Sequence, residues 1–407
     1  MSDDGDVNDD GGRLGLRRVP PPNLDAVGSD AVLEERIRAE IAAGGPVTFA
    51  RYMEIVQYDP ERGYYRAADA RPGRTGDFLT APEAHPIFGR AVARQVHEVW
   101  QQLGEPAPFV VREYGAGAGA LAAALLGGLA TDGSGLAGRA RYRAVEVDRR
   151  RLDQLAARLA AAGRADALEA DDGTPITGVV VANEVLDALP FHRVVVRAGR
   201  LREVLVGVDP SGRLTDLEGD PSTPALATRL DDEGVRLADD QQAEVCLAID
   251  AWIAAAAAGL ARGLLLLIDY GYPAAELYDP RRRPRGTLAA YVRHTVHEDP
   301  YRHVGRQDLT AHVDVTAVER AAARAGLDRL GLTTQGEFLA SLDAGELLVA
   351  LGEDPTTTVA DYLAARSALA RMIDPAAMGR FRVMLFGRAM DPGTPLRGLR
   401  VRVRRGA

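Results

Sequence analysis

The sequence predicts an α/β fold built on a mostly parallel, doubly wound sheet, and three observations support this prediction. Apolar runs of strand length alternate with stretches of helical periodicity over residues 109–184. A glycine-rich turn follows the first run, and polar side chains end the later runs. Because a strand–helix–strand order needs crossover connections, the strands are expected to run parallel.

The N-terminal part is predicted to contain a tail and three helices. Residues 1–30 are rich in Asp, Gly and Pro and bury too little apolar surface to order themselves, so we expect a disordered acidic tail. Helices are expected over 31–43, around Tyr52 and over about 86–103. The loop before the third helix gathers aromatic, acidic and glycine residues.

The central part is expected to carry the sheet. Its predicted elements follow the chain as a strand at 109–114, a helix after 119, a strand at 142–147, a helix over 150–163, and strands at 166–170 and 179–184. Alternating valines and charges over 193–208 predict an antiparallel hairpin. A helix over about 243–261 then leads into an apolar strand at 264–268.

The C-terminal part is expected to begin with a long irregular excursion over 280–305. Helices near 314–325, 335–350 and 356–372 and a strand at 381–386 then close the chain. We therefore expect a single domain over 31–407. Its parts are an N-terminal extension over 31–105, a core over 106–275 with an inserted hairpin at about 191–210, and an insertion with the C-terminal part over 276–407.

Composition excludes several classes of function. A net charge of −9 gives no electrostatic reason to expect nucleic acid as a partner. No apolar run is long enough to cross a bilayer and the first residues resemble no targeting signal, so a cytoplasmic location is expected. Cys246 is the only cysteine, which excludes an internal disulfide and a cysteine-cluster metal site. The absence of lysine excludes Schiff-base chemistry and the lysine of a P-loop.

The glycine-rich turn at 115–119 predicts a nucleoside cofactor. Gly115, Gly117 and Gly119 fit both a dinucleotide pattern and the pattern of S-adenosylmethionine (SAM) sites, while small residues also simply let a helix pack close to a strand. Glu113 favours SAM, because a carboxylate here would repel a pyrophosphate but attract a cationic amino-acid moiety.

Further carboxylates end the next two predicted strands. Glu146 is expected to accept hydrogen bonds from both ribose hydroxyls, while Asp148 is the better candidate for a helix N-cap. Asp171 and Asp172 occupy a position from which the adenine edge is contacted, although a polar turn before Gly173 explains them equally well.

The stretch 183–190, NEVLDALP, predicts the acceptor side of the site. Asn183, Glu184 and Asp187 follow a buried strand at the sheet edge where ligands bind, and two carboxylates there would orient a cationic acceptor such as a guanidinium. A helix N-cap at Asn183 is the structural alternative. His312, between two aspartates, and His192 are expected to be hydrogen-bonded structural groups or to contact the acceptor, and His312 has too few neighbouring ligands for a metal.

Several motifs together resemble the MidA-type SAM-dependent methyltransferases. They are YDPERGYY at 58–65, GDFLTAPE at 76–83 followed by Phe88-Gly89, EYGAGAG at 113–119, NEVLDALPFH at 183–192, DYG at 269–271, GTL at 286–288 and DLTAHVD at 308–314. The chain departs from the family pattern at Ala116 and at Ala84-His85-Pro86. The resemblance implies a class I Rossmann-like methyltransferase core and, in the mitochondrial relative, arginine methylation of a respiratory complex subunit.

The predicted function is therefore SAM-dependent methylation of an arginine side chain of a protein such as a respiratory complex I subunit. A nicotinamide-dependent oxidoreductase and a non-catalytic assembly factor are the alternatives. Residues expected to hold the cofactor are Glu113, Gly115, Gly117, Gly119, Glu146, Asp171, Asp172 and Asn183, with Gly76, Asp77 and Thr80 closing over it. Residues expected to act on the acceptor are Asn183, Glu184, Asp187 and His312.

Overall fold

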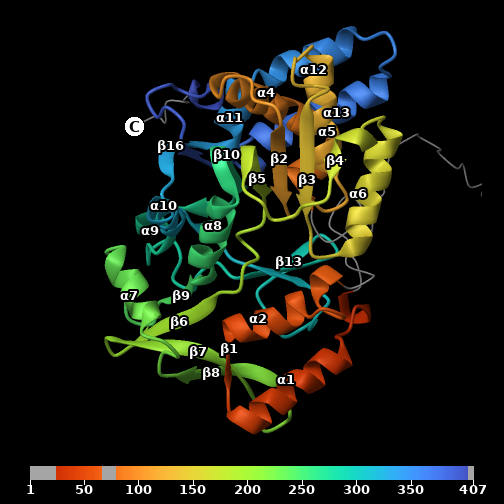
Figure 1. The fold of residues 1–407 in the computed structure, drawn as a ribbon. Helices are drawn as coiled ribbons and strands as arrows, with labels where there is room; N and C mark the ends of the chain where they lie inside the picture. The colour runs from red at the N-terminus through yellow and green to blue at the C-terminus, as the bar shows by residue number, and fades with distance from the viewer. Residues whose placement is uncertain (1–23, 67–78, 402–407) are drawn as a thin grey trace, which may run out of the picture.

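The computed structural model describes residues 24–66 and 79–401. Figure 1 shows a large central sheet covered by helices and, below the ends of its strands, a second sheet with two N-terminal helices. Most of the predicted tail lies outside the described residues. Its described end holds a short 3-10 helix at Leu24–Ala26 and Asp30, which caps the first α-helix.

The central sheet has seven strands in the order β16-β17-β10-β5-β2-β3-β4. The parallel strands are β2 (Phe109–Tyr114), β3 (Ala140–Val145), β4 (Leu168–Glu169), β5 (Ile176–Asn183) and β10 (Leu260–Asp269). At one edge, β17 (Arg382–Arg388) and β16 (Asp328–Thr334) are added antiparallel. The predicted α/β fold with a mostly parallel sheet is confirmed.

Helices cover both faces of this sheet, as Figure 1 shows. One face packs mainly against α4 (Ile87–Gln102), α5 (Ala120–Thr131), α6 (Arg149–Ala161), α11 (Gln335–Ser341) and α13 (Val359–Ile373). The other face packs against α8 (Ala248–Ala258) and α10 (Val315–Arg324). The strands are buried on both faces, which explains their continuous apolar runs.

The predicted hairpin forms, but it is the centre of a second, five-stranded antiparallel sheet. The sheet contains β1 (Val47–Thr48), β6 (His192–Arg197), β7 (Arg200–Val208), β8 (Leu214–Gly219) and β9 (Gln242–Val245). Helices α1 (Ala31–Gly44) and α2 (Phe49–Tyr58) pack beside it. The helix predicted from 243 was wrong at its start, because Ala243 and Val245 alternate inward and pair with β6, and α8 begins at Ala248.

Two other predictions need correction. The excursion over 280–305 is not irregular throughout, since β12 (Ala289–Val292) and β13 (Thr295–His297) form a three-stranded sheet with β14 (Asp308–Thr310). The helix predicted over 335–350 breaks at Asp343, whose positive φ of 54° interrupts it, and α12 (Ala344–Glu353) follows. The remaining elements are α3 (Ala81–Ala84), α7 (Ala225–Asp232), β11 (Gly271–Tyr272), α9 (Ala274–Leu277) and β15 (Val313–Asp314).

Candidate active site

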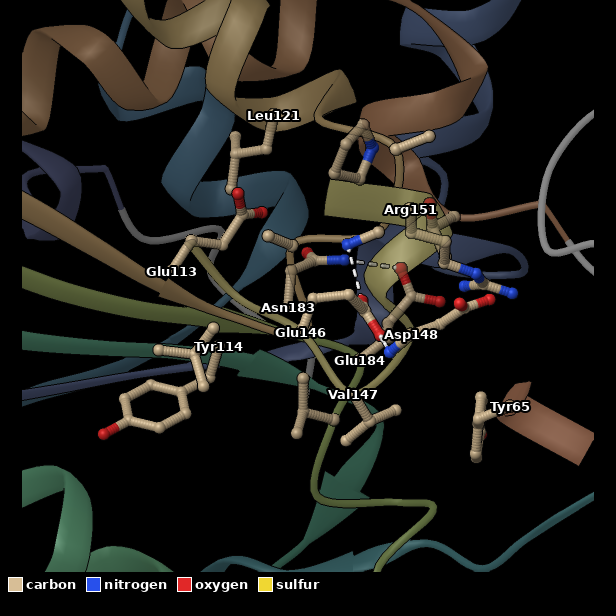
Figure 2. A pocket seen from close by; sticks show the side chains of 18 of the residues that line it. Tyr65, Glu113, Tyr114, Leu121, Glu146, Val147, Asp148, Arg151, Asn183 and Glu184 are labelled. Atoms are coloured by element: carbon tan, nitrogen blue, oxygen red, sulfur yellow. Dashed lines mark hydrogen bonds between the residues drawn. The ribbon is translucent and has the colours of Figure 1, made fainter. Parts of the chain in front are cut away.

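A cavity of about 790 Å³ lies at the carboxyl ends of β2, β3 and β5. The N-terminal segments contribute Tyr58, Tyr65 and Thr80 to its wall, and α8 contributes Trp252. Figure 2 shows carboxylates from three strand ends directed toward the same space. The lining carboxylates are Glu83, Glu113, Glu146, Asp148 and Glu184, whereas the lining guanidinium groups belong to Arg150 and Arg151. The cavity is therefore acidic.

The glycine turn forms one wall of this cavity and requires glycine for two reasons. Gly115 and Gly117 both have left-handed backbones, with φ of 69° and 52°, and both line the cavity. A Cβ on Gly115 would lie 2.7 Å from Val185 Cγ2. Gly119 does not line the cavity; a Cβ there would lie 2.6 Å from Cγ of Leu155, so this glycine lets α5 and α6 approach each other.

Glu113 is buried at the floor of the cavity, with 4% of its surface exposed. The Tyr142 hydroxyl donates a hydrogen bond of 2.6 Å to its Oε2. Burial raises the pKa of Glu113 to about 8, and the nearby carboxylates of Glu146 and Glu83 add to the rise. The carboxyl is therefore mostly protonated at neutral pH until a cation arrives beside it.

Glu146 links the end of β3 to the glycine turn. Its Oε2 accepts the Gly117 N–H at 2.8 Å and its Oε1 accepts the Asp148 N–H at 3.1 Å. Asp148 caps α6 by accepting the Arg150 N–H, as predicted for this residue. The two backbone bonds fix the Glu146 carboxylate at the cavity wall, where it can still accept bonds from hydroxyl groups.

Asn183 and Glu184 also line the cavity, at the end of β5. Glu184 has a left-handed backbone with φ of 54°, and no helix begins at Asn183, so the N-cap alternative was wrong. Asn183 Nδ2 donates to Glu184 Oε1 at 2.8 Å, whereas the buried Asn183 Oδ1 has no protein partner. Burial, and then the charge of Asp187, raise the pKa of Glu184 to about 8.

Asp187 and His312 lie on the other side of this turn. Neither lines the large cavity; both border a much smaller cavity beside Glu244 and Cys246. The Tyr270 hydroxyl donates to Asp187, and burial raises the pKa of Asp187 to about 6. Burial lowers the pKa of His312 to about 4, which keeps its ring neutral. The structure therefore does not place these two side chains beside an acceptor in the large cavity, contrary to the prediction.

The two residues predicted to contact adenine, Asp171 and Asp172, do not line the cavity. Asp171 accepts a 2.8 Å bond from Nε of the buried Arg112, and Asp172 pairs with Arg143 while accepting the Thr174 N–H at 3.0 Å. These contacts support the alternative of a polar turn. Gly76 and Asp77 lie outside the described residues.

His192 lies in the second sheet, away from the cavity lining, where its Nδ1 and Glu203 Oε1 are 2.7 Å apart.

Sequence reasoning missed the apolar and aromatic part of the wall. Tyr114, Val147, Val185 and Trp252 line the cavity, and the rings of Tyr114 and Trp252 meet edge to face at 5.3 Å. Tyr114 and Val147 directly follow residues that the strand-end argument identified, so their positions were available from the sequence. An apolar surface next to Glu146 fits a nucleoside base next to its ribose.

The arrangement of residues fits SAM. The unpartnered oxygen of Asn183 offers an acceptor to an ammonium group, and the acidic wall suits a sulfonium. Among the residues that the structure describes, no group of three His, Cys, Asp or Glu side chains could hold a metal ion. No helix in the same ranges is long and apolar enough to cross a membrane.

Comparisons with known proteins decide the family. A family model described as "Putative S-adenosyl-L-methionine-dependent methyltransferase" matches residues 91–333, which is more than half of the chain. The chain belongs to this methyltransferase family. A Burkholderia thailandensis protein crystallised with S-adenosyl-homocysteine is 36% identical with a TM-score of 0.82, and the match covers 94% of this chain and 97% of that chain. The predicted methyltransferase class and the SAM cofactor are confirmed, and the oxidoreductase alternative is not supported.

Curated relatives of this methyltransferase carry more specific names. "Protein arginine methyltransferase NDUFAF7 homolog, mitochondrial" of Drosophila melanogaster is 28% identical over 94% of this chain and 91% of its own length. "Protein arginine methyltransferase NDUFAF7, mitochondrial" of Mus musculus is 30% identical over 74% of this chain and 72% of its own length. The expectation of a cytoplasmic location conflicts with these relatives, which are named as mitochondrial, and is withdrawn.

Proposed function

We propose that the protein methylates a nitrogen of an arginine side chain in a protein substrate, such as a respiratory complex subunit. The observation that carries this proposal is the carboxyl group of Glu184, which lies in an acidic cavity that also has an aromatic wall. The names of the curated relatives, which are protein arginine methyltransferases, agree with it.

On the cofactor side, Glu113 and the free oxygen of Asn183 would hold the cationic methionine end, and Glu146 would hold the ribose. Tyr114, Val147 and Val185 offer apolar surface to the base. When bound, SAM supplies a methyl group on a positively charged sulfur. Five carboxyl groups and two guanidinium groups line the cavity, and a cationic ligand beside Glu113 and Glu184 would favour their ionised forms.

On the acceptor side, Glu184 would pair with the guanidinium and align one of its nitrogens. The C–S bond breaks as the C–N bond forms, S-adenosylhomocysteine leaves, and the methylated guanidinium gives one proton to Glu184 or to solvent. Pairing with the guanidinium would favour the ionised form of Glu184, and a carboxylate in a buried site that raises its pKa to about 8 can then take up that proton. Alignment is the main contribution of the protein, because the donor is already activated.

Tyr58 and Tyr65 would form the aromatic side of the acceptor site. Their rings lie 5.5 Å apart, and their hydroxyls donate to the Ala188 carbonyl at 2.7 Å and to Asp308 Oδ1 at 2.7 Å. Because both hydroxyls are already engaged, the rings rather than the hydroxyls are available to a guanidinium. Figure 2 shows Tyr65 on the opposite side of the cavity from Tyr114.

The test measures transfer of a labelled methyl group from SAM to a respiratory complex I fraction and to peptides containing arginine, lysine or citrulline. We expect label on arginine alone, identified as methylarginine by mass spectrometry, and much slower but measurable labelling by Glu184→Gln. Glu203→Gln is the matched control, because Glu203 is a buried carboxylate of the second sheet, away from the cavity lining. Label on lysine, or full activity of Glu184→Gln, would reject the assignment.

A further inference from the structure

The backbone that follows Glu184 is held by one buried carboxylate. Asp269 is completely buried at the end of β10. Its Oδ2 accepts the N–H groups of Val185, Leu186 and Asp187 at 3.1, 2.9 and 3.3 Å, and its Oδ1 accepts the N–H of Tyr270 at 2.9 Å. Three consecutive donors of the turn therefore converge on a single oxygen.

This turn needs such support because Glu184 is left-handed. A residue other than glycine is strained in this conformation, and such residues persist where the surroundings hold them. The Glu184 N–H donates to the Ile268 carbonyl at 2.8 Å, so β10 holds the residue from the N-terminal side as well. Residues at the end of β10 therefore accept hydrogen bonds from the N–H of Glu184 and from the N–H of the next residue, Val185.

Other contacts hold the later part of the same loop. Tyr270 donates to Asp187, and the Ala311 N–H donates to the Asp187 carbonyl at 3.0 Å. From α2, Gln57 Nε2 donates to the Ala188 carbonyl at 3.2 Å. These contacts begin three residues beyond Glu184, whereas the bonds of Asp269 begin at the next residue.

We propose that Asp269 is a positioning residue for methyl transfer, which acts by holding the 185–187 backbone so that Glu184 presents its carboxyl group to the cavity. This inference rests on the proposed role of Glu184 toward the acceptor. Asp269 itself does not line the cavity, so its effect is transmitted through the turn. This geometry also explains why the DYG motif begins with an acidic residue: its carboxyl group, at the end of β10, accepts the N–H groups of the turn.

The test is a double-mutant cycle between Asp269→Asn and Glu184→Gln in the full-length protein. Asp269→Asn keeps the size of the side chain but replaces one of the two accepting oxygens by an NH2 group, which cannot accept the backbone N–H groups that point at it. We expect kcat to fall about 10- to 100-fold, because small misplacements of an aligning group have effects of this size. The dissociation constant for S-adenosylhomocysteine should stay within about threefold, and adding Asp269→Asn to Glu184→Gln should cause no further loss of kcat.

Asp30→Asn is the matched control, because Asp30 is also buried and accepts two backbone N–H groups, at 3.1 and 3.2 Å, but at the start of α1. It should lower the melting temperature without changing kcat. The proposal is overturned if the losses of Asp269→Asn and Glu184→Gln multiply, or if Asp269→Asn affects only the melting temperature. Should Asp269→Asn fail to fold, Asp269→Glu, which displaces the carboxylate by one methylene group, is expected to show the same kcat defect.

A crystal structure of Asp269→Asn separates this proposal from the proposed function. We expect Glu184 to leave its left-handed conformation and its carboxyl group to move out of the cavity. An unchanged Glu184 would overturn the positioning role whatever the acceptor is. Conversely, wild-type protein that labels no arginine would reject the proposed function while the crystal structure still decides the role of Asp269.

Discussion

Binding of the cofactor product should release protons, because the cavity holds two carboxyl groups with raised pKa values. Burial raises the pKa of both Glu113 and Glu184 to about 8. At pH 7 a group with this pKa is roughly nine-tenths protonated. A cationic ligand placed beside it favours the ionised form, so each group that ionises fully releases about 0.9 proton at pH 7.

Isothermal titration with S-adenosylhomocysteine in buffers of different ionisation enthalpy measures this number. Other groups of the protein can also exchange protons on binding, so the informative quantity is the difference between wild type and Glu113→Gln. We expect the variant to release about one proton fewer at pH 7. Below about pH 8, the wild-type association constant should rise up to tenfold per pH unit for each group that ionises on binding, and this slope should be shallower in the variant.

Glu203→Gln is the control and should match wild type in proton release. Equal proton release by wild type and Glu113→Gln, with both variants folded, would refute the reasoning, since Glu113 would then not ionise when the ligand binds. A variant that releases more protons than wild type would refute it equally.

Three further outcomes follow from the geometry. The folded-state pKa values of Glu113 and Glu184 exceed the ordinary value of 4.5, so the ligand-free protein should lose stability as pH rises from about 4.5 to about 8. The loss is at most about 1.4 kcal/mol per pH unit for each group, and stability should level off above about pH 8. Thermal melts that show no fall in melting temperature in this window would contradict the prediction. Gly119→Ala should cost about 2–4 kcal/mol in urea unfolding, because its φ is 79° and its Cβ would lie 2.6 Å from Leu155 Cγ. Tyr65→Leu should raise the KM for the acceptor at least about threefold with unchanged cofactor affinity, whereas Tyr65→Phe should not, as the ring supplies the cation contact.

The core sheet was predictable because its signals are local. A buried strand such as β2 shows an uninterrupted apolar run, and α5 begins directly after the glycine turn. The second sheet was not predictable in the same way, because β1 and β9 contain two and four residues and gain their order from partners far along the chain. In β9 the alternation was too short to be distinguished from the helix that follows it.

The sequence predicted the positions of site residues correctly where the position follows from the end of a strand. Glu113, Glu146 and Glu184 were placed from the rule that parallel strands end at one edge, and all three line the cavity. Asp171 was misplaced because its partner is Arg112, which comes from β2 and lies 59 residues earlier in the chain. No local pattern in the sequence predicts the pairing of Arg112 with Asp171.

The direction in which the Asp187 side chain points was not predictable either, because the contacts of Asp187 come from Asp269 and Tyr270, far along the chain. In the turn that begins at the left-handed Glu184, the Glu184 side chain lines the large cavity, whereas the Asp187 side chain borders the smaller one. Asp269, which lies 82 residues beyond Asp187 in the chain, accepts three N–H groups of this turn. The next residue, Ala188, is gripped through its carbonyl oxygen by Gln57 and Tyr58 of α2. Because these bonds are to a backbone oxygen, the contact between α2 and the loop does not depend on the side chain at position 188. Described residues of the N-terminal extension, among them Tyr58, Tyr65 and Thr80, also line the cavity, so the extension contributes to the candidate site as well as contacting the loop that follows Glu184.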